Sequence, residues 1–188
     1  MTMTRSVTLE TQVDERGVIR LTLPADLRFR DVAVRLVAEA CRMIVRPRAQ
    51  FSRGSAVQSA TSSGTQLDLS DRFSAEMVSA VSEIFNNIAI HGFADRPAGD
   101  IAIEMTVARD HLAIEICDHG AAFDIAQVPK PELDALPEGG MGIHIAKACV
   151  DELDYTPGPP NVWRMTKYTS GSPMKKSKSR RAASNQPL

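Results

Sequence analysis

The stretch from Met77 to Gly92 carries two kinds of side chain on neighbouring faces of one predicted helix. Its apolar residues recur at spacings of three and four, the pattern of a helix face that packs on a core. The adjacent face carries Glu83, Asn87 and His91, four residues apart. Burial of such groups without partners costs a few kcal/mol each. The spacing favours a site where a carboxylate and an amide oxygen face a metal ion and phosphate, although a solvated helix edge gives the same pattern.

The chain around this helix has the pattern of an α/β protein. Apolar residues alternate with polar ones in four stretches, which predicts strands. These stretches are 18–23, 100–108, 111–117 and 161–168. Arg109 and Asp110 form a tight connection between the middle two stretches, which indicates an antiparallel hairpin. Helical spacing predicts further helices over 31–43 and 143–153.

The composition is that of one globular domain with extensions. The chain has 188 residues, of which 43% are hydrophobic and 24% are charged, so a core can form. Residues 48–65 are rich in Ser, Gly, Ala and Gln, which predicts a flexible insertion. Residues 169–188 form a basic tail that we expect to be disordered, and residues 1–12 form an N-terminal extension.

Charge is divided unevenly between the domain and the tail. The net charge is −1, but five of the 22 basic residues lie within 175–181, which leaves 17 basic against 23 acidic residues and a body near −6. An acidic body argues against a nucleic-acid-binding surface. We therefore expect no direct contact between the fold and nucleic acid.

Nothing in the sequence indicates a membrane or secreted protein. Its apolar runs fall short of the roughly 18 residues of a membrane span, and the first residues lack the apolar stretch of a signal peptide. Cys41, Cys117 and Cys149 lie in apolar surroundings without C-x-x-C spacing. We therefore expect reduced thiols, no cysteine metal site and a cytoplasmic location.

Two glycine-containing turns form a second group of candidate residues. Asp118 follows a predicted strand, and Gly120 lets the backbone beside this carboxylate approach a ligand closely. The carboxylate can accept from an exocyclic amine such as that of adenine; an ordinary turn is the alternative. Gly139, Gly140 and Gly142 precede a predicted helix, whose free N–H groups can bind phosphate oxygens. Here too a simple turn is the alternative, and a P-loop sequence is absent.

In this order the motifs resemble those of the GHKL (Bergerat-fold) ATPases, and most closely those of the bacterial anti-sigma-factor serine kinases. Residues 81–93 are similar to the family's V-S-E-A-x-T-N-A-x-x-H-G-Y box. Residues 118–124 look like its D-x-G-x-x-F-D turn, and residues 139–145 look like its G-G-x-G-L-x-[IL] segment. Residues 161–167 look like its closing strand. The resemblance extends over residues 13–168, which we take as the domain.

The resemblance implies a two-layer sandwich in which helices cover one mixed, mostly antiparallel sheet. It implies that Asn87 holds the Mg²⁺ that bridges the ATP phosphates, and that Glu83 acts as general base on the hydroxyl of a partner serine. Asp118 would read the adenine amine, and Gly120 would give room for the base. Residues 127–138 would form a mobile ATP lid. The remaining implied nucleotide contacts are Ala122, Gly140, Gly142 and Ile143.

Four further residues have simpler interpretations. We interpret His91 and Trp163 as packed residues rather than as ligand contacts. We interpret Lys167 as an exposed lysine at the end of a strand. Arg35 matches the position of a family arginine that helps to grip the sigma factor, although a solvated helix face also explains it.

The function implied by the resemblance is that of an ATP- and Mg²⁺-dependent protein serine kinase. It would sequester a sigma factor and phosphorylate a STAS-type anti-anti-sigma protein, and we expect a homodimer without membrane contact. A partner-switch module that binds ATP without transferring phosphate is the alternative. A histidine-kinase catalytic domain would share the fold, but we discount it because no histidine-bearing dimerisation helix precedes the domain in this sequence.

Overall fold

A computed structural model describes residues 11–13, 17–45, 69–94, 96–97, 99–123 and 141–170. The strands are β1 Thr11–Val13, β2 Val18–Pro24, β3 Asp100–Val107, β4 His111–Asp118, β5 Glu152–Thr156 and β6 Asn161–Tyr168. The helices are η1 Leu27–Phe29, α1 Arg30–Val45, α2 Arg72–Asn87, η3 Ile88–Gly92 and α3 Gly142–Cys149. The predicted insertion at 48–65, the lid at 127–138 and all but two residues of the tail lie outside the described residues.

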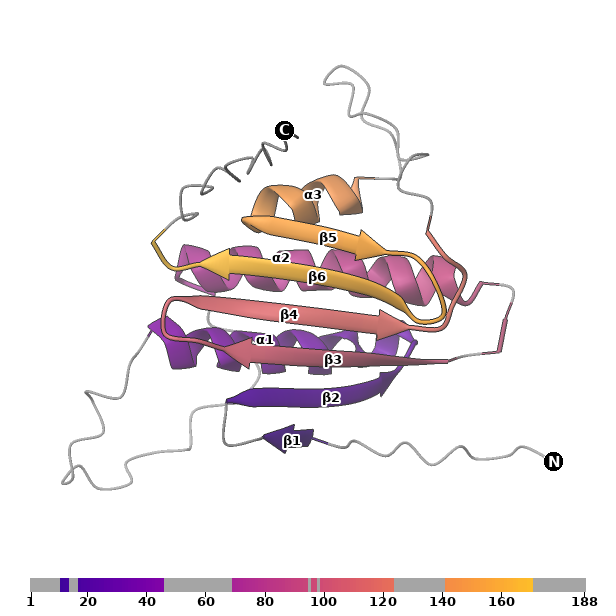
Figure 1. Cartoon of the computed structure of the whole chain (residues 1–188), viewed down its shortest axis with the longest axis horizontal. Helices are drawn as coiled ribbons and strands as arrows, with labels where there is room; N and C mark the ends of the chain where they lie inside the picture. The colour runs from indigo at the N-terminus through magenta and orange to yellow at the C-terminus, as the bar shows by residue number, and fades with distance from the viewer. Residues whose placement is uncertain are drawn as a thin grey trace, which may run out of the picture.

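The strands form one sheet in the order β1-β2-β3-β4-β6-β5, and the helices cover one of its faces (Figure 1). This arrangement confirms the predicted two-layer sandwich. Every pair of neighbouring strands is antiparallel. The described part of the sheet is therefore not mixed, contrary to our expectation, because each strand returns beside its neighbour in the opposite direction.

Alternation along the strands separates an apolar face from a polar one. Ile103 on β3 and Ile116 on β4 are paired in register, and both are buried beneath the helices. On the opposite face, ion pairs cross between strands, with Arg20 Nε 2.8 Å from Glu104 Oε2 and Arg164 Nε 2.7 Å from Glu115 Oε2. One wet face and one dry face are typical of an antiparallel sheet covered on a single side.

The strand predictions over β2, β3, β4 and β6 are confirmed, as is the hairpin between β3 and β4. The N–H of Ala108 donates to the carbonyl of His111 at 3.1 Å and closes that hairpin. The helix predicted over 143–153 is too long. It ends at Cys149 because Val150 is extended, with φ −120° and ψ 159°, and the chain then forms β5. The short strand β1 was not predicted either.

Helix α2 carries the polar row that the sequence predicts, and its geometry changes at its end. Asp71 caps its start, since Oδ1 accepts from the N–H of Ser74 at 2.8 Å. Met77 and Ile84 are buried on the core side, which confirms the apolar stripe. After Asn87 the helix continues as the π-helical segment η3. π-Helical turns frequently lie at functional sites because they re-aim side chains.

None of the helices among the described residues is long and apolar enough to cross a membrane. The three cysteines are free thiols, and Cys41 is buried whereas Cys117 and Cys149 are half-buried. Burial raises the pKa of the Cys41 thiol to about 12 and that of Cys117 to about 11. Thiols with raised pKa values are poor nucleophiles.

Candidate functional site

The start of α3 lies directly on the polar row of α2. A Cβ atom on Gly142 would be 2.7 Å from Oε2 of Glu83 and 3.3 Å from Nδ2 of Asn87. Both distances are shorter than ordinary contacts, so a side chain at this position would displace the polar groups of Glu83 and Asn87, whereas a glycine leaves them in place. The structure thus brings together three of the predicted site residues, with N–H groups of a helix start beside a carboxylate and an amide.

The side chain of Asn87 has unused hydrogen-bonding capacity. Its Nδ2 atom is buried and has no hydrogen-bond partner among the described residues. Buried polar atoms are nearly always bonded, so an orphan atom at this position indicates that a ligand completes it. Because a half-turn of the side chain exchanges the amide oxygen and nitrogen, either end can face the ligand. The site therefore fits a phosphate with its metal ion.

Asp118 lies at the end of β4 and is only 2% exposed. Its Oδ1 atom accepts from the N–H of Gly120 at 2.7 Å and from Nδ2 of Asn161 at 3.0 Å. Both of these bonds use Oδ1. Within the described part of the chain no hydrogen bond is made by Oδ2, which is left to accept from a ligand amine.

The turn after Asp118 packs against η3, the segment that continues α2. A Cβ atom on Gly120 would be 2.6 Å from the carbonyl oxygen of Gly92. The N–H of Ala121 donates to that same oxygen at 2.7 Å. The turn that holds Asp118 is therefore tied to the helix that carries Glu83 and Asn87, so the first two sequence motifs form one site.

An open pocket with about 370 Å³ of empty space lies between these elements. Its lining residues are Asn87, Ile88, His91, Gly92, Asp118, Ala121, Ala122, Phe123, Tyr155, Asn161 and Trp163. Trp163 is 2% exposed, which confirms the expected core position, but its ring also forms part of the pocket wall. The interpretation of His91 as a packed residue is wrong, since its exposed side chain lines the pocket.

One side of this pocket was not predicted from the sequence. Tyr155 on β5 packs against Trp163, with ring centroids 4.2 Å apart and an interplanar angle of 34°. Its hydroxyl accepts from the N–H of Phe123 at 2.8 Å and donates to Oδ1 of Asn161 at 3.2 Å. Burial raises the pKa of this hydroxyl, which keeps it protonated as a donor. The alternation of residues 152–156 was the signal that could have revealed β5.

The other predicted nucleotide contacts are placed less favourably or lie outside the described residues. Ile143 is 8% exposed and belongs to the core, so its side chain is not placed to contact a ligand. Its backbone N–H is the part of this residue that remains for such a contact. Gly139 and Gly140 lie outside the described residues. Arg35 is exposed on α1, as a residue of a partner-binding or solvated face would be.

Within the described ranges, the site offers one candidate protein ligand for a metal ion, the side chain of Asn87. The described residues contain no group of three or more His, Cys, Asp or Glu side chains that could hold a metal ion. Mg²⁺ usually keeps several waters and binds through one or two protein groups plus substrate phosphates. The residues present thus fit a Mg²⁺ that arrives with a nucleotide, with Asn87 as the ligand on the protein.

Lys167 is not the exposed lysine that we expected. It is 9% exposed, and its Nζ atom lies 2.5 Å from Oε2 of Glu76 on α2. The same ammonium donates to the carbonyl of Cys149 at 2.8 Å and so joins β6 to the end of α3. The hydrogen bond from Lys167, and next that from Arg72, hold the pKa of Glu76 below its usual value.

Replacement of Lys167 by methionine is expected to cost more stability than the loss of an exposed ion pair. Exposed pairs contribute about 0–1 kcal/mol, whereas removal of one partner from a fully buried pair costs about 3–5 kcal/mol. We expect a loss between these limits at pH 7, measured by urea unfolding. Arg20→Met, which removes the exposed pair with Glu104, is the control; equal losses would contradict the buried role of Lys167.

The same loss should depend on pH. The pKa of Glu76 is lower in the folded chain, so its stabilisation is present above the pKa of an unfolded glutamate, about 4.3. It disappears as the pH falls through the lower, folded value, because the carboxyl then becomes protonated. The difference between the wild type and Lys167→Met should therefore shrink in acid, and a difference that grows in acid would contradict this account.

Comparison with known proteins identifies the family to which the chain belongs. Residues 45–167, about two thirds of the chain, match the model of the histidine kinase-like ATPase domain. The chain belongs to this family. In this histidine kinase-like ATPase, the match includes every element that forms the site, from α2 to β6, and leaves β1, β2 and nearly all of α1 outside. The glycine contacts and the pocket are thus features of an ATPase domain.

Individual relatives share about a third of their residues with this chain over the aligned parts. The chain is 30% identical over 100 residues to serine-protein kinase RsbW of Bacillus velezensis, an alignment that covers 49% of this chain and 62% of that protein. It is 34% identical over 109 residues to the anti-sigma F factor of Thermoanaerobacter sp., covering 55% of this chain and 76% of the relative. A solved histidine kinase domain from Erythrobacter litoralis aligns with 53% of the chain and 46% of that domain, at 23% identity and a TM-score of 0.42. The chain spans less than two thirds of the RsbW kinase.

Proposed function

We propose that this protein is an ATP- and Mg²⁺-dependent protein serine kinase that sequesters a sigma factor and phosphorylates a STAS-type anti-anti-sigma protein. The observation that carries the proposal is the contact of Gly142 with Glu83 and Asn87, which joins a phosphate-binding helix start to a carboxylate and an amide. The names of two relatives, a serine-protein kinase and an anti-sigma factor, support the same function. We further propose that the protein acts in the cytoplasm as a homodimer.

The residues of the site divide the work of nucleotide binding. Asp118 and the aromatic pocket bind the base, and the N–H groups near Gly142 bind phosphate oxygens. Asn87 supplies an oxygen ligand for Mg²⁺. When bound, Mg²⁺ neutralises negative charge on the phosphates. The interactions are directional and hold the terminal phosphate beside the row on α2.

Glu83 provides the chemistry for an incoming serine. Its carboxylate is half-buried next to the start of α3 and accepts the proton of the serine hydroxyl. The serine oxygen then forms a bond to the γ-phosphorus, while the bond from that phosphorus to the bridging oxygen breaks and ADP leaves. Asn87, through the metal ion, and the N–H groups near Gly142 would hold the terminal phosphate beside Glu83, and positioning of this kind can supply much of the rate enhancement.

A partner-switch module that binds ATP without transferring phosphate is the second candidate. The name of one relative, the anti-sigma F factor, refers to a sigma-factor partner and does not mention a kinase. Such a protein would use the same pocket, and its nucleotide would hold the partner-binding conformation. The two candidates differ only in whether the terminal phosphate moves.

The test is phosphate transfer to a STAS protein encoded in the same genome. The purified chain, Mg²⁺ and ATP labelled in the γ-phosphate are incubated with that protein, and the modified residue is found by mass spectrometry. The proposal predicts label on one serine of the STAS protein. ATP binding with no transfer to any STAS protein of that genome would contradict the kinase and support the binding module.

A further inference from the structure

A directed chain of hydrogen bonds runs along the wall of the pocket. The N–H of Phe123 donates to the oxygen of Tyr155 at 2.8 Å. The hydroxyl of Tyr155 donates to Oδ1 of Asn161 at 3.2 Å, and Nδ2 of Asn161 donates to Oδ1 of Asp118 at 3.0 Å. Four residues from the turn, β5, β6 and β4 thus form one connected network.

The direction of this chain is fixed by its first member. A backbone N–H can only donate, so the Tyr155 oxygen must accept from Phe123 and turn its own proton towards Asn161. The N–H of Gly158 also donates to Oδ1 of Asn161, at 3.1 Å. With two donors at its oxygen, the Asn161 amide can only present its NH₂ group to Asp118.

This orientation determines what Asp118 can recognise. Oδ1 is engaged by Nδ2 of Asn161 and by the N–H of Gly120, and a carboxylate oxygen that faces two donors acts as an acceptor. Asp118 lines the pocket, and Oδ2 is its remaining acceptor. A purine with an amino group at position 6 donates to that oxygen, whereas a 6-oxo purine places an acceptor against it. Mismatched polar groups in such a site are strongly rejected.

We propose that Tyr155 is a positioning residue for base specificity: through Asn161 it holds Asp118 as an acceptor, so that the pocket selects 6-amino over 6-oxo purine nucleotides. This inference rests on the proposed nucleotide site, and it assigns the selection to a residue of β5 that does not itself bond the amine. Loss of the hydroxyl leaves the N–H of Phe123 without this acceptor and removes one of the two donors at Asn161. The amide keeps its bonds to the N–H of Gly158 and to the carbonyl oxygens of Gly120 and Ala121. Without the Tyr155 donor its position is set less firmly, so its hold on the Asp118 carboxylate loosens.

Tyr155→Phe tests this role because it deletes the hydroxyl and keeps the ring that packs on Trp163. The Kd values of ADP and IDP, which differ in the group at position 6, are measured for the full chain with Mg²⁺. Trp163 is the only tryptophan and lines the pocket, so its fluorescence reports binding. We expect the wild type to prefer ADP by about 100-fold or more, and the variant to lose about tenfold of that preference through weaker ADP binding.

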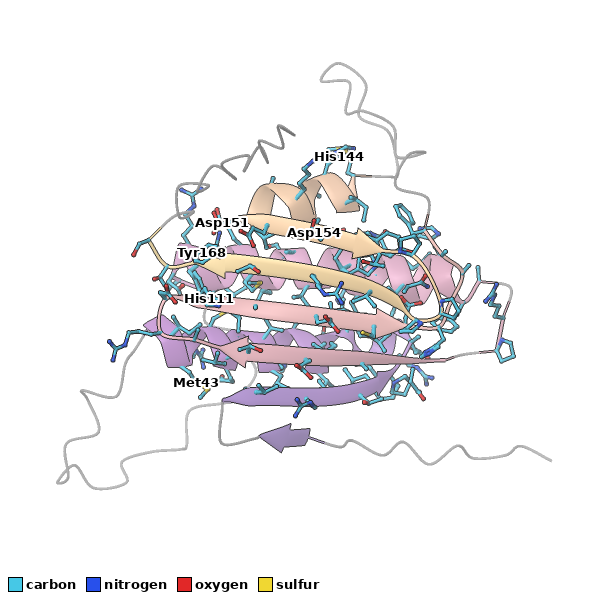
Figure 2. All side chains as sticks on the ribbon, in the orientation of Figure 1. Met43, His111, His144, Asp151, Asp154 and Tyr168 are labelled. Carbon is cyan, nitrogen blue, oxygen red and sulfur yellow. The ribbon has the colours of Figure 1, made fainter. Side chains whose placement is uncertain are left out.

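Tyr168→Phe is the matched control. Tyr168 is the other tyrosine of the chain and lies at the opposite end of β6 from Asn161, beside His111 (Figure 2). Deletion of its hydroxyl should leave the ADP to IDP preference unchanged. A purely structural role of Tyr155 would lower the melting temperature and leave this preference intact, so the ratio separates positioning from stability.

A double-mutant cycle tests the route through Asn161. In an Asn161→Ala background the hydroxyl has lost its acceptor, so Tyr155→Phe should have no further effect on the preference. An unchanged preference in Tyr155→Phe, or an equal effect in both backgrounds, overturns the inference while the proposed kinase stands. A wild type that binds neither nucleotide overturns both. A wild type that prefers ADP but transfers no phosphate refutes only the kinase, and the cycle still decides the role of Tyr155.

Discussion

Replacement of Glu83 by glutamine is expected to lower phosphate transfer to the STAS serine by about 10²–10⁴-fold, the usual contribution of a general base. Glutamine has the same shape as glutamate but cannot take the proton of the serine hydroxyl. It still fits beside Gly142, where an added Cβ atom would lie 2.7 Å from Oε2 of Glu83. ATP affinity should therefore stay close to that of the wild type. Single-turnover transfer and nucleotide titration measure the two quantities separately.

The matched control for this variant is Glu104→Gln on the open face of the sheet. Glu104 pairs with Arg20 at 2.8 Å, on the face of the sheet opposite the helices. The same change of charge there should leave transfer unaffected. If Glu83→Gln transferred phosphate as fast as this control, Glu83 would not be the general base.

Replacement of Gly120 by alanine is expected to weaken nucleotide binding by about 100-fold or more, because overpacking at this turn moves the Asp118 carboxylate, which we propose binds the base. The added Cβ would lie 2.6 Å from the carbonyl oxygen of Gly92 and 2.9 Å from Oδ1 of Asp118. The first of these atoms is backbone and cannot rotate away. The turn must therefore shift, and Asp118 shifts with it. Titration with ADP measures the effect.

Gly92→Ala is the control for the folding cost of a methyl group at this junction. Its Cβ would meet atoms at 3.6–3.8 Å, which is ordinary van der Waals contact. We expect Gly92→Ala to melt close to the wild type and Gly120→Ala to lose about 1–3 kcal/mol of stability. Equal melting temperatures for the two variants would contradict the close packing of the turn on η3.

The parts of the site that the sequence predicts are those that depend on local pattern. The four-residue spacing of Glu83 and Asn87 places them on one face of α2, whatever packs against it. Gly120 and Gly142 stand where backbone must approach a neighbour, and glycine marks such places. Strand alternation predicted the hairpin of β3 and β4 for the same reason, since a period of two is a property of neighbouring residues.

The parts that the sequence does not predict depend on distant partners. Lys167 can be buried because its ammonium pairs with Glu76 and donates a hydrogen bond to the carbonyl of Cys149. Both partners lie on other elements. β5 is short, and its place at the sheet edge is set by its pairing with β6. Tyr155 belongs to the site because that pairing brings its hydroxyl to Asn161. Pairing of this kind follows from the tertiary fold rather than from local propensity.

The most direct test of the assigned site is calorimetric titration of ATP into the wild type and into Asn87→Ala, each with and without Mg²⁺. The Nδ2 atom of Asn87 is buried and lacks a hydrogen-bond partner among the described residues, which supports our proposal that this side-chain amide, turned to present its oxygen, is the ligand of the ion. We predict one ATP per wild-type chain, tighter binding with Mg²⁺, and no gain from Mg²⁺ in Asn87→Ala. A wild type that binds no ATP, or a Mg²⁺ effect that survives in Asn87→Ala, would contradict this assignment.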